Sequence, residues 1–577
     1  MPGRVHVVHG DLTALDCDVA VVPTDALLRV ESSWHELVTQ DEARAALPNG
    51  WRAAGGRSAD IGRREDDGPV RVLVQVAARG SEPVGWYVDG VREALRRTQD
   101  SGCRPAARRG RPLVGLPLVG TGLGGGAGSR GDLIPPLLEL LAEHVAAVDV
   151  DVALVTFDRS DYAAVQAARS AGDGGALPAP LEEHAQRLAE LAAGGELVPF
   201  LGAGVSAAAG LPAWWELLER VADTGEVLRG ADPRELHGLG PLDAAELLKT
   251  ALGDGAVEAV THQLEARRHA LVHGLLASLR APRAVTTNYD RLYERACERP
   301  LGGLAVLPWD ALEPGRPWLA KVHGDVGHPD SIVLSRGDLL GYDLTRRPLS
   351  SLLQGQMLTG HLLFVGSSMT DDAVIRLAWE VRELQRAWGA PPRVVGTVLG
   401  LREEPLRARL WQDVLAFVPL APGRAPGDDV PDAGTDGRGD PEGALPAFLD
   451  RLAQLASRER SYLLDPRYAG LVPEPLRPLR AALDALGEAL DALAPDVDPA
   501  TSAQATAALQ AFGRRRPSDG REASERERRD VGVRGAPLGE VREDQAHERR
   551  ELEPLPGVAA GEHDAARQRV EDEAPVR

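Results

Sequence analysis

The sequence has few cysteines, almost no lysine and no long apolar run. Its three cysteines, Cys17, Cys103 and Cys297, lie far apart and form no CxxC pair, so neither a disulfide framework nor a thiolate zinc site is expected. No window approaches the roughly 18 consecutive apolar residues of a membrane span. The N-terminal stretch MPGRVHVVHGDLT also lacks the basic flank and apolar run of a signal peptide. We therefore expect a cytoplasmic protein without a membrane segment.

Positive charge is scarce as well. The 577 residues include 65 Lys and Arg against 86 Asp and Glu, which gives a net charge of −21, and only Lys249 and Lys321 are lysines. A net charge of this sign argues against a general nucleic-acid binder and against a protein that binds anionic membranes. The histidines near the N-terminus, His6, His9 and His35, do not have the spacing of metal ligands, so no metal site is expected.

A chain of this length predicts three or four domains. Residues 1–170 alternate short β-branched runs with helical patterns, which is typical of an α/β fold. The runs are RVHVVHG, DVAVVPT, VRVLVQVA, PLVGLPLVG and DVALVTF. Residues 171–180, AGDGGALPAP, are rich in Gly, Pro and Ala without periodicity, and this composition predicts a linker.

A second series of strands and helical patterns fills residues 181–420. Strands are predicted at ELVPFLG, PRAVTTN, AVLPW, LLFVGSS and RVVGTVLG, and their alternation with helices favours a Rossmann-like parallel sheet. Residues 421–444 are acidic and turn-forming, which predicts a loop or linker, and residues 445–512 form a predicted helical segment. Residues 513–577 are highly charged and poor in apolar side chains, so they are expected to be disordered, with a salt-bridged helix as the alternative.

The first candidate site is the turn in ELVPFLGAGVSAAAG, where an apolar strand is followed by glycines and then by a predicted helix. Glycines let the backbone approach a phosphate closely, and the N-terminus of the following helix would present free N–H groups to it. The turn therefore predicts a pyrophosphate-binding site made of Gly202, Ala203, Gly204 and Ser206. The alternative is steric, because a tight turn from strand to helix needs glycine with or without a ligand.

Two further predicted strands, PRAVTTN and LLFVGSS, end in polar or small residues, and a third element, KVHGD, carries a histidine before a Gly–Asp turn. Ligands of open α/β sheets bind beyond the carboxyl ends of strands. A histidine at such a place can act as a general base on a sugar hydroxyl or on water, and a small hydroxyl residue can contact a phosphate or a ribose. The alternatives are a helix cap for an Asn or Asp and an ordinary hydrogen-bonded surface histidine. The candidates are Thr287, Asn288 and Asp290 in TTNYD, His323 in KVHGD, and Gly366 and Ser367 in FVGSS.

Taken in order, the segments GAGVS, TTNYD, KVHGD and FVGSS resemble the sirtuin family over about residues 185–420. The form TTNYD, with GLPAWWEL after the GAG turn, is more similar to the bacterial sirtuin-like domains that destroy NAD in anti-phage defence than to protein deacylases. The resemblance implies that NAD+ binds as substrate and that Asn288 and Asp290 lie near the nicotinamide ribose. It also implies that His323 is the general base and that Gly366 and Ser367 lie beside the adenosine half.

The sequence departs from the deacylases at two places. It lacks the Cys-rich zinc ribbon that helps to build the acyl-lysine cleft, so no zinc is expected. The aromatic–arginine pair that deacylases carry after the GAG segment is replaced by Pro212, Ala213, Trp214 and Trp215. Both departures favour water over acyl-lysine as the nucleophile.

The first domain contains a second candidate nucleotide site. The turn HGDLT and the loop LVGTGLGGGAG resemble the macro domain, a three-layer α/β/α fold that binds ADP-ribose, over about residues 4–170. The resemblance implies that Asp11 faces the adenine amino group. The usual asparagine after the second strand is replaced by Thr24 and Asp25, so binding without hydrolysis is expected. The diphosphate contacts that the resemblance implies are Gly120, Thr121, Gly122, Leu123 and Gly124. The alternative is that this glycine run is a loop without function.

The sequence thus predicts an NAD+ glycohydrolase in which Asn288, Asp290 and His323 are catalytic, acting in bacterial antiviral defence. The first domain would bind or sense ADP-ribose-type nucleotides produced by the second, and the protein is expected to form a homo-oligomer. Two alternatives remain at this stage. One is an NAD-dependent protein deacylase or ADP-ribosyltransferase, and the other is a sensor that binds NAD or ADP-ribose without catalysis.

Overall fold

The computed structural model describes most of residues 3–514, and the described residues belong to one compact unit. The predicted disordered tail, residues 513–577, lies outside the described residues from residue 515 onward. The other segments left undescribed are 26–28, 47–56, 65–67, 77–81, 101–104, 106–108, 121–129, 173–174, 225–226, 229–231, 254, 370, 389–392, 422–440 and 494–497.

The N-terminal part contains a six-stranded sheet in the order β1-β6-β5-β2-β4-β3, which is parallel except for β3, antiparallel to β4. The strands are β1 (Val5–His9), β2 (Val19–Thr24), β3 (Ser58–Asp60), β4 (Val70–Gln75), β5 (Leu113–Pro117) and β6 (Asp151–Thr156). The helices of this part are α1 (Gln40–Ala46), α2 (Val84–Asp100), α3 (Arg130–Ala147) and α4 (Arg159–Ser170), with a short 3-10 turn, η1 (Leu12–Ala14), after β1.

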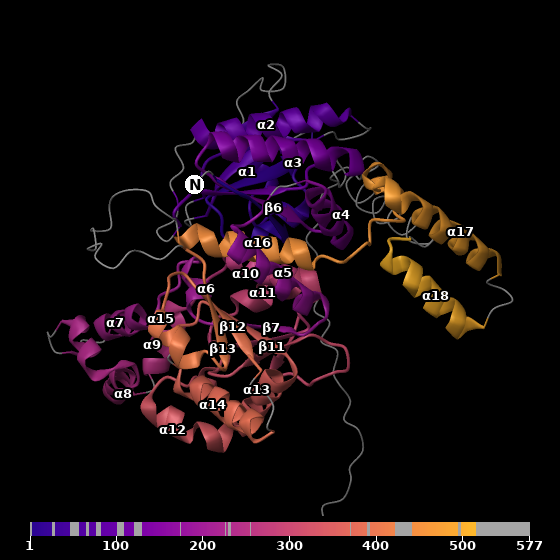
Figure 1. Cartoon of the computed structure of the whole chain (residues 1–577). Coiled ribbons are helices and arrows are strands. Elements are labelled where there is room, and N and C mark those ends of the chain that lie inside the picture. Colours follow the sequence, from indigo (N-terminus) through magenta and orange to yellow (C-terminus); the bar gives the residue numbers. More distant parts are fainter. Residues whose placement is uncertain are drawn as a thin grey trace, which may run out of the picture. The chain divides into compact units, whose positions relative to one another are not determined.

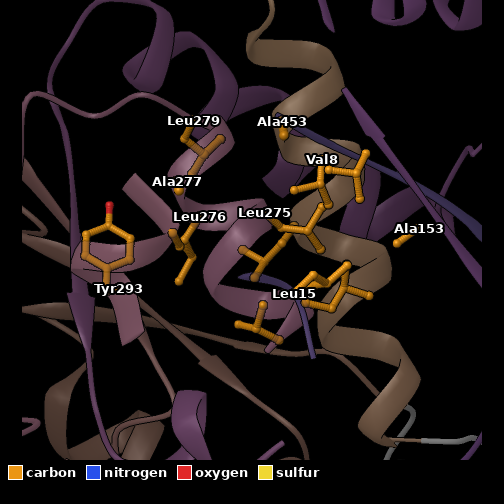
Figure 2. Packing of buried hydrophobic residues seen from close by; sticks show 14 of the residues in the cluster. Val8, Leu15, Ala153, Leu275, Leu276, Ala277, Leu279, Tyr293 and Ala453 are labelled. Carbon is orange, nitrogen blue, oxygen red and sulfur yellow. The ribbon is translucent and has the colours of Figure 1, made fainter. Parts of the chain in front are cut away.

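Helices cover both faces of this sheet, because successive side chains of a strand point to opposite faces. Val7 belongs to a core shared with α2 and α3, whereas Val8 belongs to a second core shared with helices that follow much later in the chain. These helices are α10 (Leu271–Ser278) and α16 (Pro441–Ala456). Figure 2 shows Val8 and Leu15 beside Leu275 and Ala453. The expected three layers are therefore present, but part of one outer layer comes from residues beyond 170.

The second sheet has seven strands in the order β13-β12-β11-β7-β8-β10-β9, and all the pairs between them are parallel. Its central strands are continuous apolar runs, as expected for a parallel sheet that is covered on both faces (Figure 1). The parallel fold predicted for this part is confirmed. The strands are β7 (Leu197–Leu201), β8 (Arg283–Thr286), β9 (Ala305–Leu307), β10 (Trp318–Lys321), β11 (His361–Val365), β12 (Gly396–Gly400) and β13 (Leu415–Pro419).

The helices around the second sheet connect its strands in sequence. The chain runs from β7 to β8 on one side and later returns to β11 on the other side of β7, so the strand order reverses next to β7. Ligands of open α/β sheets bind at such a reversal. The helices are α5 (Ala179–Ala193), α6 (Gly204–Ala207), α7 (Trp214–Thr224), α8 (Pro241–Leu252), α9 (Gly255–Gln263), α11 (Leu292–Leu301), α12 (Arg336–Thr345), α13 (Arg347–Thr359), α14 (Asp372–Ala387) and α15 (Pro405–Trp411).

The last helices begin earlier than the sequence predicts. Helix α16 starts at Pro441, inside the expected acidic linker 421–444, because it packs against the N-terminal part. Its Asp450 accepts a hydrogen bond from the Val7 amide at 2.9 Å and pairs with Arg169 at 2.6 Å. Helices α17 (Arg477–Leu493) and α18 (Pro499–Ala511) follow. Among the described residues, no helix is both long enough and apolar enough to cross a bilayer.

Buried histidines predict that acid destabilises this fold. Burial is the main cause that lowers the pKa of His9, His269 and His361 to about 4, below the ordinary value of 6.5. Between these two values the unfolded chain binds protons that the folded chain does not. The free energy of unfolding should therefore be highest above about pH 6.5 and fall by about 1.4 kcal/mol per pH unit for each histidine as the pH drops toward 4. Urea unfolding at a series of pH values measures this slope.

The variant His361→Gln serves to isolate one histidine in this experiment, because His361 is buried and its ring bonds to Thr397 at 2.8 Å. The variant lacks one titrating ring, so its slope between pH 6.5 and 5 should be smaller by about 1.4 kcal/mol per pH unit. An unchanged slope would contradict the assignment of a neutral, buried His361.

Candidate functional site

The four predicted site segments follow four neighbouring strands. Strands β11, β7, β8 and β10 are adjacent and parallel, so their carboxyl ends lie at one edge of the sheet. The segments after them begin at Gly366, Gly202, Thr287 and Val322. The structure therefore places all four segments at the edge where α/β proteins bind ligands, on both sides of the strand reversal next to β7.

The glycines of the turn after β7 are explained by a close backbone approach to the turn after β11. The amides of Gly202 and Gly204 donate to Val365 O and Gly366 O, both at 2.9 Å. A Cβ atom at Gly202 would lie 2.5 Å from Gly366 O, and one at Gly204 would lie 2.9 Å from the Gly366 Cα. Gly366 itself has a φ of +65°, a conformation that favours glycine. The steric explanation for the GAG turn is therefore observed.

The helix expected directly after this turn is a single turn, α6, and the next helix, α7, begins only at Trp214. The amides of Val205 and Ser206 donate back to Gly202 O and Ala203 O. The expectation of a helix N-terminus with free N–H groups is thus not met here. Ala203 and Gly204 form the exposed part of the turn, whereas Gly202 and Ser206 are buried.

Ser206, Asn288 and Asp290 form one hydrogen-bonded cluster. The Ser206 hydroxyl donates to Asp290 Oδ2 at 2.8 Å, and the Asn288 amide nitrogen donates to Ser206 Oγ at 3.2 Å and to Gly202 O at 3.1 Å. All three side chains are buried. The structure thus joins the turn after β7 to the turn after β8 through side chains that the sequence singled out. Thr287 links the same two turns through its amide, which donates to Leu201 O at 3.2 Å.

One polar atom of this cluster is left over. Asn288 is only 9% exposed, and its Oδ1 has no hydrogen-bond partner among the described residues. Burying a carbonyl oxygen without a hydrogen-bond partner costs free energy. This atom is therefore suited to accept a hydrogen bond from a ligand hydroxyl or from a water molecule. Asp290 instead uses its second oxygen, Oδ1, to accept the Leu292 amide at 3.0 Å at the start of α11. Asp290 thus bonds to the first amide of α11 from the position before the N-cap Arg291, in addition to its contact with Ser206.

His323 lies after β10, and its Nε2 is 3.1 Å from Asp371 Oδ2. Asp371 also caps α14 by accepting the amides of Ala373 and Val374, which holds its carboxylate in place. The Asp371 carboxylate is thus a fixed negative charge beside the His323 ring. Asp371 was not among the predicted site residues, and its contact with His323 was not predicted. Ser367 Oγ lies in the turn after β11, where it accepts the Met369 amide at 3.3 Å.

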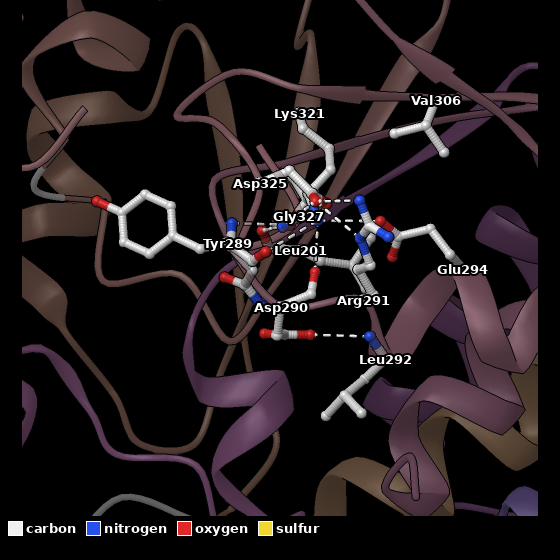
Figure 3. Close-up of polar contacts among 12 residues, drawn as sticks. Leu201, Tyr289, Asp290, Arg291, Leu292, Glu294, Val306, Lys321, Asp325 and Gly327 are labelled. Atoms are coloured by element: carbon white, nitrogen blue, oxygen red, sulfur yellow. Dashed lines mark hydrogen bonds and ion pairs between the residues drawn. The ribbon is translucent and has the colours of Figure 1, made fainter. Parts of the chain in front are cut away.

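Lys321, at the end of β10, supports the loop that carries Asn288 and Asp290 (Figure 3). Its side chain is 0% exposed, and its ammonium donates to the carbonyl oxygens of Tyr289 and Asp290 at 3.2 and 2.5 Å. It also pairs with Asp325 at 2.6 Å and Glu294 at 2.9 Å. Burial alone would raise the pKa of Asp325, but the hydrogen bond from Arg291 and the charge of Lys321 outweigh it and lower the pKa. The loop is therefore fixed by a buried cation with two carboxylate partners.

The N-terminal candidate site is described only in part. Asp11 precedes η1, and its Oδ1 accepts the Thr13 amide at 2.9 Å and the Thr13 hydroxyl at 2.8 Å. Gly120 has a φ of +74°, and a Cβ atom there would lie 2.6 Å from the Tyr87 ring. The remaining predicted contacts, Thr121, Gly122, Leu123 and Gly124, lie outside the described residues.

The candidate residues do not line either of two surface cavities near β9 and β10. A cavity of about 660 Å³ is lined by Trp309, His328 and Arg346 among others, and one of about 250 Å³ by Arg291, Glu294 and Asp325 among others. Trp309 and His328 stack with ring centroids 4.3 Å apart between the two cavities. Within the described part of the chain, no group of three or more metal-ligating side chains is present.

Comparison with known proteins bears on the second sheet. Residues 282–415 match the family model of the SIR2-like domain, so the predicted resemblance to sirtuin-like domains is confirmed. Defense-associated sirtuin 2 of Bacillus subtilis is 26% identical over 211 residues, which are 35% of this chain and 21% of that protein. NAD(+) hydrolase ThsA of Bacillus cereus (strain MSX-D12) is 31% identical over 180 residues, 30% of this chain and 37% of that protein.

The similarity to these relatives is partial. NAD(+) hydrolase ThsA of Enterococcus faecium is 29% identical over 221 residues, 35% of this chain and 44% of that protein. The chain thus spans less than half the length of each of these relatives. Among solved structures, a mutant macrodomain of Oceanobacillus iheyensis matches 29% of this chain and 91% of its own, with 14% identity and a TM-score of 0.22. A TM-score of this size does not establish a shared fold, so the macro-domain resemblance stays a prediction.

Proposed function

We propose that this chain hydrolyses the bond between nicotinamide and ribose in NAD+, and that it does so in anti-phage defence. The observation that carries the proposal is the Asn288 side chain. Ser206 and Gly202 hold its amide nitrogen, and its buried Oδ1 has no partner among the described residues. The proposal is supported by the similarity to relatives named NAD(+) hydrolase ThsA and Defense-associated sirtuin 2.

The proposed reaction breaks the C1′–N bond of the nicotinamide riboside. The bonding electrons leave with nicotinamide, the ribose passes through a state with positive charge at C1′, and a water oxygen forms the new bond to C1′. Asn288 Oδ1 would accept a hydrogen bond from this water or from a ribose hydroxyl and so place it for attack. The buried Asp290 carboxylate would stabilise the positive charge as it develops.

His323 is the proposed base. Its Nε2 lies 3.1 Å from Asp371 Oδ2, so the negative charge of the capping carboxylate stands beside the ring. The His323 ring would take the proton that the attacking water releases. For the rest of NAD+, the proposed contacts are the exposed face of the turn at Ala203 and Gly204 together with Gly202, Ser206, Thr287, Gly366 and Ser367.

Product analysis tests this proposal. The full chain is incubated with NAD+ with and without an acetylated peptide, and the products are separated by chromatography. Hydrolysis predicts nicotinamide and ADP-ribose in equal amounts whether or not the peptide is present. Nicotinamide release that depends on the peptide would indicate a deacylase instead. No release under any condition, including the presence of phage components, would overturn the proposed hydrolysis.

For the N-terminal part we propose binding of ADP-ribose through the turn at Asp11. Replacing Asp11 with alanine removes the carboxylate, and the affinity for ADP-ribose should fall by about tenfold, which corresponds to one lost hydrogen bond of about 1.4 kcal/mol. Calorimetric titration of the full chain with ADP-ribose measures this effect as a tenfold rise in the dissociation constant of one class of sites. The control Thr13→Val keeps the Asp11 carboxylate and removes only the Thr13 hydroxyl that donates to it. Equal binding by the parent and Asp11→Ala would contradict the assignment.

A further inference from the structure

Helix α10 brings a buried histidine to the cluster around Asn288. All eight residues of α10 are buried, and the helix leads into β8, the strand that ends at the Asn288 loop. His273 is 0% exposed, and its Nε2 lies 3.3 Å from Ser206 Oγ. No sequence motif pointed to this residue, which lies 67 positions from Ser206. Its ring contacts the one side chain that bonds to both Asn288 and Asp290.

The hydrogen bonds of Ser206 determine whether the His273 ring donates to it or accepts from it. A hydroxyl has one proton to donate and two lone pairs to accept with. Ser206 has an acceptor in Asp290 Oδ2, 2.8 Å away, which takes its proton, and it accepts one hydrogen bond from the Asn288 amide nitrogen at 3.2 Å. Only a lone pair is left for His273. With the Ser206 proton directed to Asp290, the ring can bond to Ser206 only by donating a proton from Nε2.

His273 can play this part only as a neutral ring with a fixed tautomer. Burial is the main cause that holds the pKa of His273 well below its ordinary value, and the neighbouring His269 lowers it further. The two rings lie with centroids 6.4 Å apart. A neutral imidazole donates from one nitrogen only, so the contact with Ser206 has a defined direction.

We propose that His273 is a positioning residue that sets the orientation of the Asn288 amide. Its N–H occupies one lone pair of Ser206, so that the Ser206 proton points to Asp290 and the remaining lone pair points to Asn288. Asn288 must then turn its nitrogen toward Ser206, which leaves Oδ1 on the opposite side of the amide. Gly202 O also accepts from the amide nitrogen, so the nitrogen has two acceptors, and a Ser206 hydroxyl turned toward Asn288 would remove one of the two that hold this orientation.

The catalytic consequence rests on the proposed NAD+ hydrolysis. Replacing His273 with leucine removes the N–H and keeps an apolar side chain, and kcat should fall by about 10- to 100-fold while KM stays within about threefold. The variant His273→Gln keeps an N–H at similar reach and should recover most of kcat. Loss of kcat in both variants to the same extent would overturn the proposal, because any change of packing would then suffice.

The control for packing is His361→Leu. His361 is also buried and also bonds to a hydroxyl, that of Thr397, but it lies at the start of β11, at the opposite end of the strands from the site. His361→Leu should lose thermal stability as His273→Leu does and keep its kcat within about threefold. A fall in kcat equal to that of His273→Leu would show that stability alone explains the effect.

A double-mutant cycle tests whether His273 acts through Ser206. If it does, His273→Leu should lower kcat by less than about threefold in a chain that already carries Ser206→Ala, because the group it orients is absent. Fully additive losses would overturn the proposal.

A measurement that does not need NAD+ separates this proposal from the proposed function. The nitrogen chemical shifts of selectively labelled histidine report which ring nitrogen carries the proton. For the folded parent chain, the His273 ring should be neutral with its proton on Nε2, and the resonance should move in Ser206→Ala. A proton on Nδ1 would overturn the positioning role even if NAD+ is cleaved. The Nε2–H tautomer in a chain that releases no nicotinamide would support the positioning role while overturning the proposed hydrolysis.

Discussion

Replacement of Asn288 with alanine is expected to lower the rate of nicotinamide release from NAD+ by about 10²- to 10³-fold, the loss seen when one pre-placed hydrogen-bonding group is removed from an active site. The physical reason is the geometry of the amide, whose nitrogen is held by Ser206 and Gly202 and whose Oδ1 is buried without a partner. Alanine removes the acceptor that would place the water or the ribose hydroxyl. Because this contact is proposed to act at the reacting carbon, kcat should fall more than KM rises.

The matched control for this variant is Gln356→Ala. Gln356 is a second buried amide whose side-chain oxygen has no partner among the described residues, but it lies at the end of α13, just before the start of β11. It is thus at the opposite edge of the sheet from Asn288. We expect Gln356→Ala to keep nicotinamide release within about threefold of the parent. An Asn288→Ala chain that folds and still works at more than about a tenth of the parent rate would refute the assigned role.

Most strands of the two sheets were predicted from the sequence, because buried parallel strands are recognisable as apolar runs. The runs ELVPFLG and LLFVGSS correspond to β7 and β11, which are buried along their whole length. Strand β13 was not predicted, since it lies at the edge of the sheet and only Leu415 and Val418 of its residues are fully buried. Strand β10 has only four residues and ends in a lysine, so its run is too short to stand out.

The site was predicted in its backbone positions and not in its contacts. The order of the strand ends placed Ser206, Asn288 and Asp290 at one edge, and the structure joins them by hydrogen bonds. The contact between His273 and Ser206 could not be predicted, because an apolar helix with one histidine gives no sign of what the ring touches. Asp371 had a weak signal in its place at a helix start directly after FVGSS.

The third layer of the N-terminal part shows the same limit over a longer distance. Asp450 binds the amide of Val7 across 443 residues of chain. In the sequence, helix α16 has the pattern of an ordinary amphipathic helix. A local pattern of this kind does not identify the face of the sheet that the helix covers. The boundaries predicted from composition at 171–180 and 421–444 therefore show where segments of the chain are joined. They do not show which segments pack against each other in the tertiary structure.

Replacement of Lys321 with methionine is expected to lower the free energy of unfolding by about 3–5 kcal/mol, the cost of removing one partner from a buried ion pair. Lys321 is 0% exposed, and its partner Asp325 is 1% exposed in its side chain. Methionine fills a similar volume but leaves the Glu294 carboxylate without its cation and the Asp325 carboxylate with Arg291 alone. It also releases the carbonyl oxygens of Tyr289 and Asp290. Urea unfolding of the parent and the variant measures the difference.

The chain's other lysine provides the control. Lys249 pairs with Asp338 at 2.5 Å, but its side chain is 35% exposed, so water screens the pair. Lys249→Met should therefore cost less than about 1 kcal/mol. Because Lys321 also fixes the loop of Asn288, its variant should lose nicotinamide release under conditions where the chain is still folded, whereas Lys249→Met should not. Equal losses of stability in the two variants would show that the buried network around Lys321 contributes no more than a surface ion pair.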